Sequence, residues 1–361
     1  MSAGLFFFGI LPVMVKEQKH TTLYRAYRPG SFDEVRGQPQ VTGVLEKAIA
    51  NKKIAHAYLF AGGRGTGKTS VARILARELR VSDKDLYEMD AASNRGIDDI
   101  RELREGVYAM PFDSKYKFYI IDEAHMLTKE AWNAFLKTLE EPPAHAIFVL
   151  ATTDRDKVPD TIQSRCEIYT FNQPTREVLA GIVTDVAKKE GYTFERAAAE
   201  LVALLAEGSF RDALSILQKV LAVSKDKKVN VAEVEAVSGA PRGELVRQIL
   251  TGLAAKDGAV ALAAIEQAVK ENMDMRTLAK LLIHRMRVIL LLRYAPDLAK
   301  DFPHELTEAD LELVKEVVKN PGITSDTLRA LLDAYERMAY AALPHLPLEL
   351  AVIDCVSAEK K

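Results

Sequence analysis

A glycine-rich run, Gly62 to Thr69, limits the fold of this chain more than any other feature of the sequence. The run reads GGRGTGKT and matches the pattern GxxxxGK[ST]. The apolar segment Tyr58–Phe60 comes directly before it, and a helical pattern over Ser70–Leu79 follows. In such a strand–loop–helix unit, the loop N–H groups and the helix N-terminus attract phosphate. We therefore expect a nucleotide-binding α/β fold; a glycine turn with a chance lysine is the alternative.

We expect this loop to surround the phosphates of ATP together with Mg²⁺. Lys68 can reach the β- and γ-phosphates, and the Thr69 hydroxyl is suited to hold the metal ion. The residues of this segment that we expect to bind the nucleotide are Gly62, Gly63, Arg64, Gly65, Thr66, Gly67, Lys68, Thr69 and Ser70.

Two carboxylates follow a later apolar strand, Phe118–Ile121. Asp122 is suited to bind Mg²⁺ through water, and Glu123 is suited to orient or deprotonate the attacking water. Two acids at a strand end can also form an ordinary solvated turn, but the preceding phosphate loop favours the catalytic interpretation. The tetrapeptide Asp122–His125 spells a helicase signature, yet nothing else in the sequence supports the paired domains of a helicase.

Short apolar runs alternate with helical stretches between His56 and Phe171, which is typical of an α/β layer with a largely parallel sheet. The expected strands are Ala57–Ala61, Leu86–Asp90, Phe118–Asp122, Ile147–Thr152 and Glu167–Phe171. Ligands of such sheets gather at the carboxyl ends of the strands. At one of these ends a hydroxyl of Thr152 or Thr153 could polarise the attacking water, although threonine is also simply a good β-forming residue.

Beyond Pro174 we expect no further strands. Helical periodicity over Arg176–Glu190, Phe194–Ala206 and Ser209–Val223 predicts a small helical domain. Gly239 and Pro241 mark a second boundary, after which helices run to the end of the chain. We divide the chain into an N-terminal appendage expected to be disordered (1–20), a nucleotide-binding domain (21–173), a helical lid domain (174–240) and an all-α C-terminal domain (241–361).

Composition and charge limit the partners and the cellular compartment that we expect for this chain. Its net charge is −2 and its pI is near 6.4, so nucleic acid must be bound by a local patch. Its two cysteines, Cys166 and Cys355, lie far apart, which argues against disulfides and favours the cytoplasm. The apolar run Leu5–Val15 is too short to span a bilayer and lacks the flanks of a signal peptide, so we expect no membrane association. Translation from Met14 would explain this run, and a membrane-surface anchor is the alternative.

Further motifs occur in an order that resembles one known family. They are Tyr24–Pro29, Asp90–Gly96, Asp122–Leu127, Ala134–Pro143, Ala151–Asp154, Ser164–Cys166 and Gly208–Leu214. Together with the phosphate loop they resemble the gamma/tau family of bacterial DNA polymerase III, whose members are AAA+ ATPases of the sliding-clamp loader. The resemblance covers the first two domains and implies an ATP-hydrolysing subunit that loads a sliding clamp onto primer-template DNA during replication. The family is classed with DNA-directed DNA polymerases, which are nucleotidyltransferases.

The resemblance also implies roles for three residues outside the loop. Thr153 would be the polar sensor, and Arg211 would be a second sensor that contacts the γ-phosphate in the same chain. Arg165 would be an arginine finger that projects into the ATP site of a neighbouring subunit and stabilises charge on the transferring phosphoryl group. For both arginines the alternative is a surface ion pair, worth about 0 to 1 kcal/mol.

Contacts with the base and with DNA are further implications of the resemblance. The residues that would lie beside the adenine are Tyr24, Arg28, Pro29 and Val35, although such residues also pack against a core. The residues that would face duplex DNA are Asn94, Arg95 and Arg101, around the start of a helix. A solvated charged face is the alternative.

The chain departs from the family pattern in one connection. Members commonly carry a four-cysteine zinc module after the phosphate-loop helix, but here Arg80–Lys84 leads directly to the next strand, so we expect no zinc. No segment like the extension of the tau form follows Lys361, so we also expect its polymerase- and helicase-binding parts to be missing.

The expected partners are delta-like and delta-prime-like subunits, other copies of the chain, a sliding clamp and primer-template DNA. By resemblance, the helices from Leu245 to Ala358 would form an oligomerising collar. One alternative is a non-hydrolysing scaffold like the delta-prime stator, which the intact Lys68 and Glu123 disfavour. Another is an AAA+ remodeller of a different DNA machine, such as a branch-migration motor, which the sequence around Arg165 disfavours.

Overall fold

A parallel five-stranded sheet forms the centre of the N-terminal part of the computed structural model, which describes residues 22–94, 96–299 and 306–357. The strands are β1 Ala57–Gly62, β2 Leu86–Asp90, β3 Lys117–Asp122, β4 Ala146–Thr152 and β5 Glu167–Phe171, in the spatial order β2-β3-β4-β1-β5. All the expected strands are confirmed to within one residue at each end. Because every neighbouring pair is parallel, the carboxyl ends lie along one edge of the sheet.

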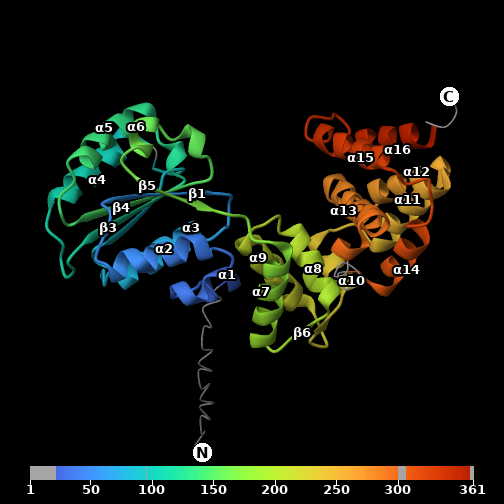
Figure 1. The fold of residues 1–361 in the computed structure, drawn as a ribbon, viewed down its shortest axis with the longest axis horizontal. Helices are drawn as coiled ribbons and strands as arrows, with labels where there is room; N and C mark the ends of the chain where they lie inside the picture. The colour runs from blue at the N-terminus through green and yellow to red at the C-terminus, as the bar shows by residue number, and fades with distance from the viewer. Residues whose placement is uncertain (1–21, 95, 300–305, 358–361) are drawn as a thin grey trace, which may run out of the picture.

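Helices cover both faces of this sheet (Figure 1). One face packs against α2 Pro39–Ala50 and α3 Lys68–Glu78, and the other against α4 Ile97–Tyr108, α5 Lys129–Glu140 and α6 Asp160–Gln163. Successive residues of a strand point to opposite faces, so Tyr58 and Phe60 lie on the α2–α3 side and Leu59 on the other. All three are fully buried, which is why the strand reads as a continuous apolar run. Short 3₁₀ helices at Phe32–Glu34, Ala124–Met126 and Arg155–Lys157 connect these elements.

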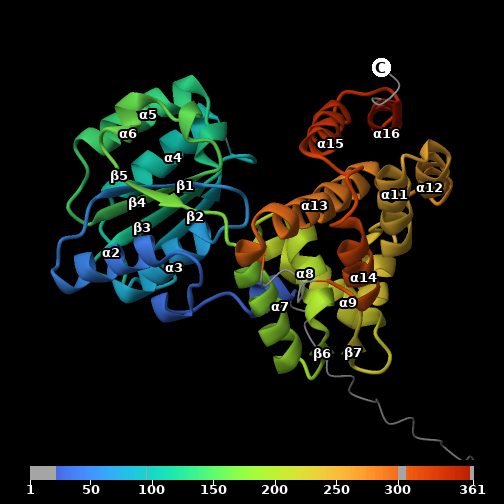
Figure 2. The same cartoon turned by 45° about the vertical axis from the view of Figure 1, so that its right-hand side comes forward.

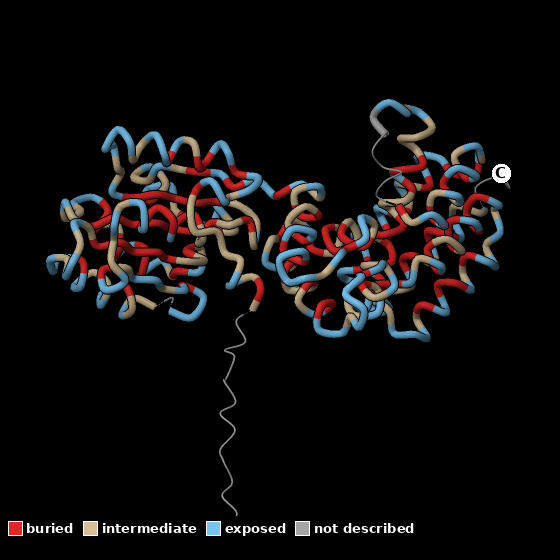
Figure 3. The backbone as a smooth tube through the Cα atoms, turned by 90° about the horizontal axis from the view of Figure 1, so that it is seen from below, coloured by how far each residue is buried: buried red, intermediate tan, exposed pale blue. Residues whose placement is uncertain are grey.

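The middle unit, residues 175–238, has its own buried core (Figure 3). Its helices are α7 Arg176–Lys189, α8 Arg196–Leu205, α9 Phe210–Val223 and α10 Val231–Ser238. The short helix α1 Leu23–Ala26 also packs here, and the Leu23 N–H donates to the Gln218 side chain at 2.9 Å. The first residues of the described chain therefore pack against the middle unit, which follows much later in the sequence.

The expectation that strands stop at Pro174 is wrong. The two-residue strands β6 Thr193–Phe194 and β7 Lys228–Val229 pair in parallel. Phe194, expected at the start of a helix, lies in β6. Strands of this length have no period that a sequence could display.

The C-terminal unit, residues 243–357, is helical throughout its described part, as expected (Figure 2). Its elements are α11 Gly243–Ala255, α12 Gly258–Lys270, α13 Met275–Tyr294, a 3₁₀ helix Pro296–Ala299, α14 Glu308–Val317, α15 Ser325–Arg337 and α16 Leu346–Ser357. Among the described helices, none has the length and apolar character that crossing a membrane requires. The expected appendage 1–20 and the alternative start at Met14 lie outside the described residues.

One buried carboxylate fixes the connection between α3 and β2, where the family pattern would place zinc. Asp85 is 0% exposed and accepts the N–H groups of Phe112, Asp113 and Ser114 at 2.5, 2.9 and 2.8 Å. Burial alone would raise the pKa of Asp85, but these donors outweigh it and hold the pKa below its ordinary value.

Replacing Asp85 by Asn should lower the free energy of unfolding by about 1 to 3 kcal/mol, because the amide leaves buried N–H groups unsatisfied. The folded-state pKa of Asp85 is lowered, so its contribution is present above the unfolded pKa of about 3.9 and is lost as pH falls through the folded value. Urea unfolding at neutral pH and at about pH 3 should show a smaller difference between the two proteins in acid. Asp83→Asn, at an exposed carboxylate of the same connection, should change the free energy by less than about 0.5 kcal/mol; equal effects would contradict this account.

Candidate functional site

The phosphate loop leaves the carboxyl end of β1 and enters α3. The φ angles of Gly65 and Gly67 are 70° and 104°, a region that favours glycine. A Cβ atom at Gly65 would lie 2.0 Å from Ser209 Oγ of the middle unit, so this glycine is also required by space. The helix begins at Lys68, two residues before the expected start at Ser70. Its free N–H groups therefore begin inside the loop, where they can bind phosphate.

The Lys68 side chain lies inside the loop. Its Nζ donates to the carbonyl oxygens of Gly62 and Gly63 at 2.8 and 2.7 Å, and the residue is 6% exposed. Burial lowers the pKa of Lys68, while the carboxylates of Glu123 and Asp122 oppose the shift. The ammonium group is thus placed between the loop backbone and the two acids, where phosphate oxygens would compete for it.

The two expected magnesium ligands are in direct contact. Thr69 Oγ1 donates to Asp122 Oδ2 at 2.8 Å. A hydroxyl and a carboxylate are oxygen ligands of the kind that Mg²⁺ binds together with waters and phosphates, so these residues fit the ion. Within the described ranges, no group of three or more His, Cys, Asp or Glu side chains is arranged to hold a metal ion.

The expected base and sensor also meet at this edge. Thr153 Oγ1 donates to Glu123 Oε2 at 3.0 Å, and His125 Nδ1 lies 3.5 Å from the same oxygen. The Glu123 φ angle is 48°, and its N–H donates to Asp122 Oδ1 at 3.0 Å. Positive φ is uncommon for glutamate and clusters at functional sites. The ends of β3 and β4 therefore hold the carboxylate in a defined position beside the loop.

Arg211 lies in the first turn of α9, next to the loop. The Phe210 N–H donates to the Gly65 carbonyl at 3.0 Å, which ties this turn to the phosphate loop. The Arg211 guanidinium lies 5.0 Å from the centre of the Tyr24 ring. The expected second sensor, Arg211, therefore contacts Tyr24, which was expected beside the adenine.

The other expected adenine-side residues lie between α1 and α2. Arg28 is partly buried, and burial, followed by the charge of Arg73, lowers its pKa against the opposing Glu88 and Asp122. Val35 packs against the core beside α2 and α3, and Pro29 is partly buried. For Val35, this core packing is the alternative that the sequence left open.

The contacts of Arg165 tie it to α5 and α6 rather than to the loop of its own chain. Its guanidinium donates to Glu140 Oε1 at 2.7 Å and to the Thr161 carbonyl at 2.6 Å. The side chain is 33% exposed. This is the ion pair that the sequence left as an alternative, and the guanidinium side chain is partly exposed.

The expected DNA-facing residues lie around the start of α4. Asn94 donates to the Asp90 carbonyl at 3.2 Å, Arg101 pairs with Asp98 at 3.1 Å, and Arg95 lies outside the described residues. Asp99 Oδ2 accepts the Gly96 N–H at 3.0 Å. Acidic side chains therefore already occupy the first turn of this helix, which weakens its attraction for phosphate.

The sequence interpretation missed two polar residues beside the loop. Gln38, just before α2, is fully buried and bonds the backbone of Thr66 and Asn172. Ser209 accepts the Asp212 N–H as the N-cap of α9 and lies against Gly65. A serine before a helix is a recognisable cap, but nothing local marks Gln38 as buried.

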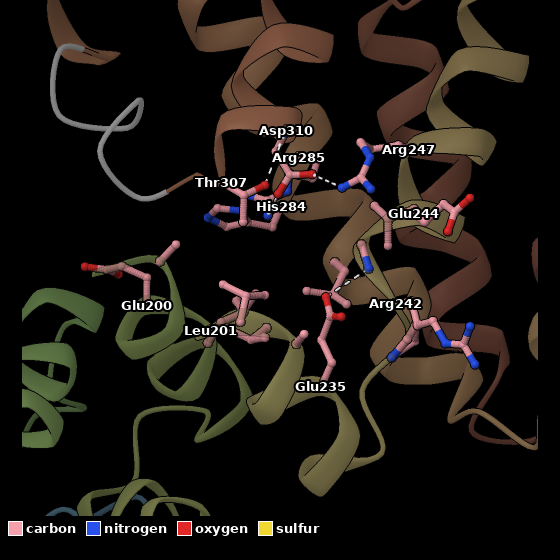
Figure 4. Close-up of a pocket in the computed structure, with 18 residues that line it drawn as sticks. Glu200, Leu201, Glu235, Arg242, Glu244, Arg247, His284, Arg285, Thr307 and Asp310 are labelled. Atoms are coloured by element: carbon pink, nitrogen blue, oxygen red, sulfur yellow. Dashed lines mark hydrogen bonds and ion pairs between the residues drawn. The ribbon is translucent and has the colours of Figure 1, made fainter. Parts of the chain in front are cut away.

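A separate cavity lies between the middle and C-terminal units. It encloses about 320 Å³ and contains an ion-paired group, Asp310 with Arg247 and Arg285, across from Glu235 (Figure 4). None of its lining residues belongs to the expected nucleotide site. We place the candidate site at the loop because the backbone expected to bind phosphate and both acids converge there.

Known proteins share this organisation. The family model described as DNA polymerase III, delta subunit, matches residues 37–96 and 80–175, and the model of the DNA polymerase III clamp loader subunit, ATPase lid domain, matches residues 179–226. The gamma/tau subunit of DNA polymerase III from Mycobacterium tuberculosis is 37% identical over 89% of this chain and 58% of its own length. The tau subunit from Bacillus subtilis is 35% identical over 92% of this chain and 63% of its own length. The chain thus spans about three fifths of these relatives.

Solved structures share the fold. The Thermotoga maritima RuvB Holliday junction branch migration motor is 25% identical over 63% of this chain and 79% of its own, with a TM-score of 0.51. A RuvB variant from the same organism is 22% identical over 88% of this chain, with a TM-score of 0.52, and shows the fold alone. The expected AAA+ ATPase fold is therefore confirmed.

Replacing Lys68 by Ala should weaken ATP binding by roughly 10- to 100-fold, because charge-assisted hydrogen bonds to phosphate are lost. Calorimetry or a fluorescent ATP analogue would measure this. The matched control is Lys52→Ala, at an exposed lysine after α2, which should bind ATP like the unchanged protein. Equal affinity of the Lys68 variant and the control would place the phosphates elsewhere.

Proposed function

Since the chain belongs to the gamma/tau family of DNA polymerase III subunits, we propose that it is an ATP-hydrolysing subunit of a clamp loader. In this proposal ATP binding opens a sliding clamp and holds primer-template DNA, and hydrolysis releases both. The observation that carries it is the pair of contacts Thr69–Asp122 and Thr153–Glu123 beside the phosphate loop. A non-hydrolysing scaffold would not need this set.

The residues present would divide the work of hydrolysis. Lys68 would bind the β- and γ-phosphates, while Thr69 and Asp122 would hold Mg²⁺, which neutralises charge on the phosphates. Glu123 would orient the attacking water, and the Thr153 hydroxyl would keep the carboxylate in place. Arg211 lies on the turn of the middle unit that is bonded to Gly65, and from there it would approach the γ-phosphate.

We propose that Arg165 acts in a neighbouring subunit. Its partner Glu140 is 43% exposed, so this ion pair is weakly held and can be exchanged when another chain approaches. A guanidinium delivered across the junction would stabilise charge on the transferring phosphoryl group. Hydrolysis would then depend on assembly.

The C-terminal unit is the proposed collar. Tyr340, Leu343, Leu346, Leu350 and Ile353 expose 94%, 52%, 42%, 49% and 46% of their surface on or beside α16. An apolar surface of this kind is typical of contacts between subunits. The proposed partners are delta-like and delta-prime-like subunits, other copies of the chain and a clamp. The polymerase classification would describe the assembly, because the residues at this site are those of phosphate hydrolysis.

Arg165→Ala should reduce the DNA-stimulated ATPase of the assembled complex by about 10³-fold, because arginine fingers contribute that much to turnover. The ATP affinity of the isolated chain should stay unchanged, since Arg165 does not contact the loop of its own chain. Steady-state ATPase with partner subunits, clamp and primed DNA would measure the effect. The control is Arg155→Ala, at an exposed arginine that bonds Gln163 in the same region. Full activity of the Arg165 variant would refute assembly-dependent hydrolysis.

The shared fold with the branch migration motor favours a second candidate, a remodeller of branched DNA. ATP-dependent co-purification with a sliding clamp would separate the two. We expect the chain with its partner subunits to retain the clamp in ATP and to release it in ADP. ATP-dependent movement of a four-way junction without clamp binding would instead support the second candidate.

A further inference from the structure

The buried side chain of Gln38 joins three separate segments beside the phosphate loop. Its Nε2 donates to the Asn172 carbonyl at 2.7 Å and to the Thr66 carbonyl at 3.4 Å. Its Oε1 accepts the Asn172 N–H at 3.1 Å and Gln40 Nε2 at 3.0 Å. The reverse orientation of the amide would set donor against donor at Asn172, so the network itself fixes the orientation.

The segments that Gln38 joins belong to different parts of the site. Thr66 is a buried residue of the phosphate loop, and Asn172 is the first residue after β5, where the chain leaves the sheet for the middle unit. Gln38 itself is the N-cap residue of α2. A shift of the loop toward phosphate would therefore pull on the start of the connection to the middle unit.

Further contacts also link the phosphate loop to the middle unit. The carbonyl of Gly65, next to Thr66, accepts the N–H of Phe210, which directly precedes Arg211. The Gln173 side chain lies close to both Gly63 and Gly208, where added Cβ atoms would approach it to 3.4 and 3.1 Å. Loop, connection and first turn of α9 thus form one continuous set of contacts.

We propose that Gln38 is a positioning residue that couples occupation of the phosphate loop to the orientation of the middle unit, and so places Arg211. The proposal rests on the nucleotide binding and hydrolysis proposed above. Gln38 contacts no reacting atom; it acts through Thr66 and Asn172. Its loss should therefore affect turnover more than nucleotide affinity.

The test compares the unchanged chain with Gln38→Met, which keeps the side-chain length and removes its amide. In the assembled ATPase we expect kcat to fall by about 10- to 100-fold and KM for ATP to change by less than about threefold. Hydrogen exchange with a non-hydrolysable ATP analogue supplies the second readout. In the unchanged chain, the analogue should slow the exchange of the backbone amides of residues 62–70 and of the first turn of α9. In the variant, protection should remain at the loop and be lost at α9.

The matched control is Gln218→Met, which removes another glutamine bond between the N-terminal segment and the middle unit without touching the loop. It should keep kcat and the protection of α9. If Gln38→Met does not fold, Gln38→Glu is the second variant; it keeps the shape and the acceptor but loses both donated bonds. We again expect kcat to fall with little change in KM, and protection to be lost at α9 but kept at the loop.

Two results would overturn the proposal. If Gln38→Met leaves kcat and the protection of α9 unchanged, the hydrogen bonds of Gln38 do not couple the loop to the middle unit. If the variant loses protection at both the loop and α9, Gln38 only maintains the shape of the loop. If the unchanged chain hydrolyses ATP but α9 gains no protection, the coupling fails while the proposed function stands. If it binds no ATP, both fail.

Discussion

The parallel register of β3, β4 and β1 is the constraint on which the site depends. Three strands from separate parts of the sequence end along one edge. The loop after β1, the acids at the end of β3 and the threonines at the end of β4 therefore meet without any local sequence relation. An antiparallel neighbour would send one of these groups to the opposite edge. The buried apolar strands therefore both stabilise the fold and position the residues proposed to hydrolyse ATP.

Much of this arrangement could be predicted from the sequence because its determinants are local. Each strand of the sheet reads as an apolar run, and the phosphate loop has a pattern of its own. What could not be predicted depends on partners distant in sequence. β6 and β7 exist only because Thr193 and Lys228 are brought side by side. The hydrogen bonds that satisfy the buried Gln38 come from Asn172, at the other end of the sheet domain in sequence. The role expected for Arg165 depends on another chain and remains a prediction.

The contacts beside the loop also show how a small ligand could influence a large molecule. Phosphate would meet a lysine that is already desolvated and bonded to the loop backbone, so its binding exchanges one set of oxygen partners for another. The neighbouring carbonyls of Gly65 and Thr66 face the middle unit and Gln38. Because tightly packed junctions have discrete arrangements, a small change at the loop can be passed on as a rotation of whole helices.

The hydrogen-bonded carboxylate of Asp85 has a consequence for where such a chain can operate. A connection held by chelating cysteines depends on the supply of a transition metal and on thiols staying reduced. Here one carboxylate and three backbone amides hold the same connection. The bonds that hold this turn involve no thiol, and they weaken when Asp85 is protonated in acid.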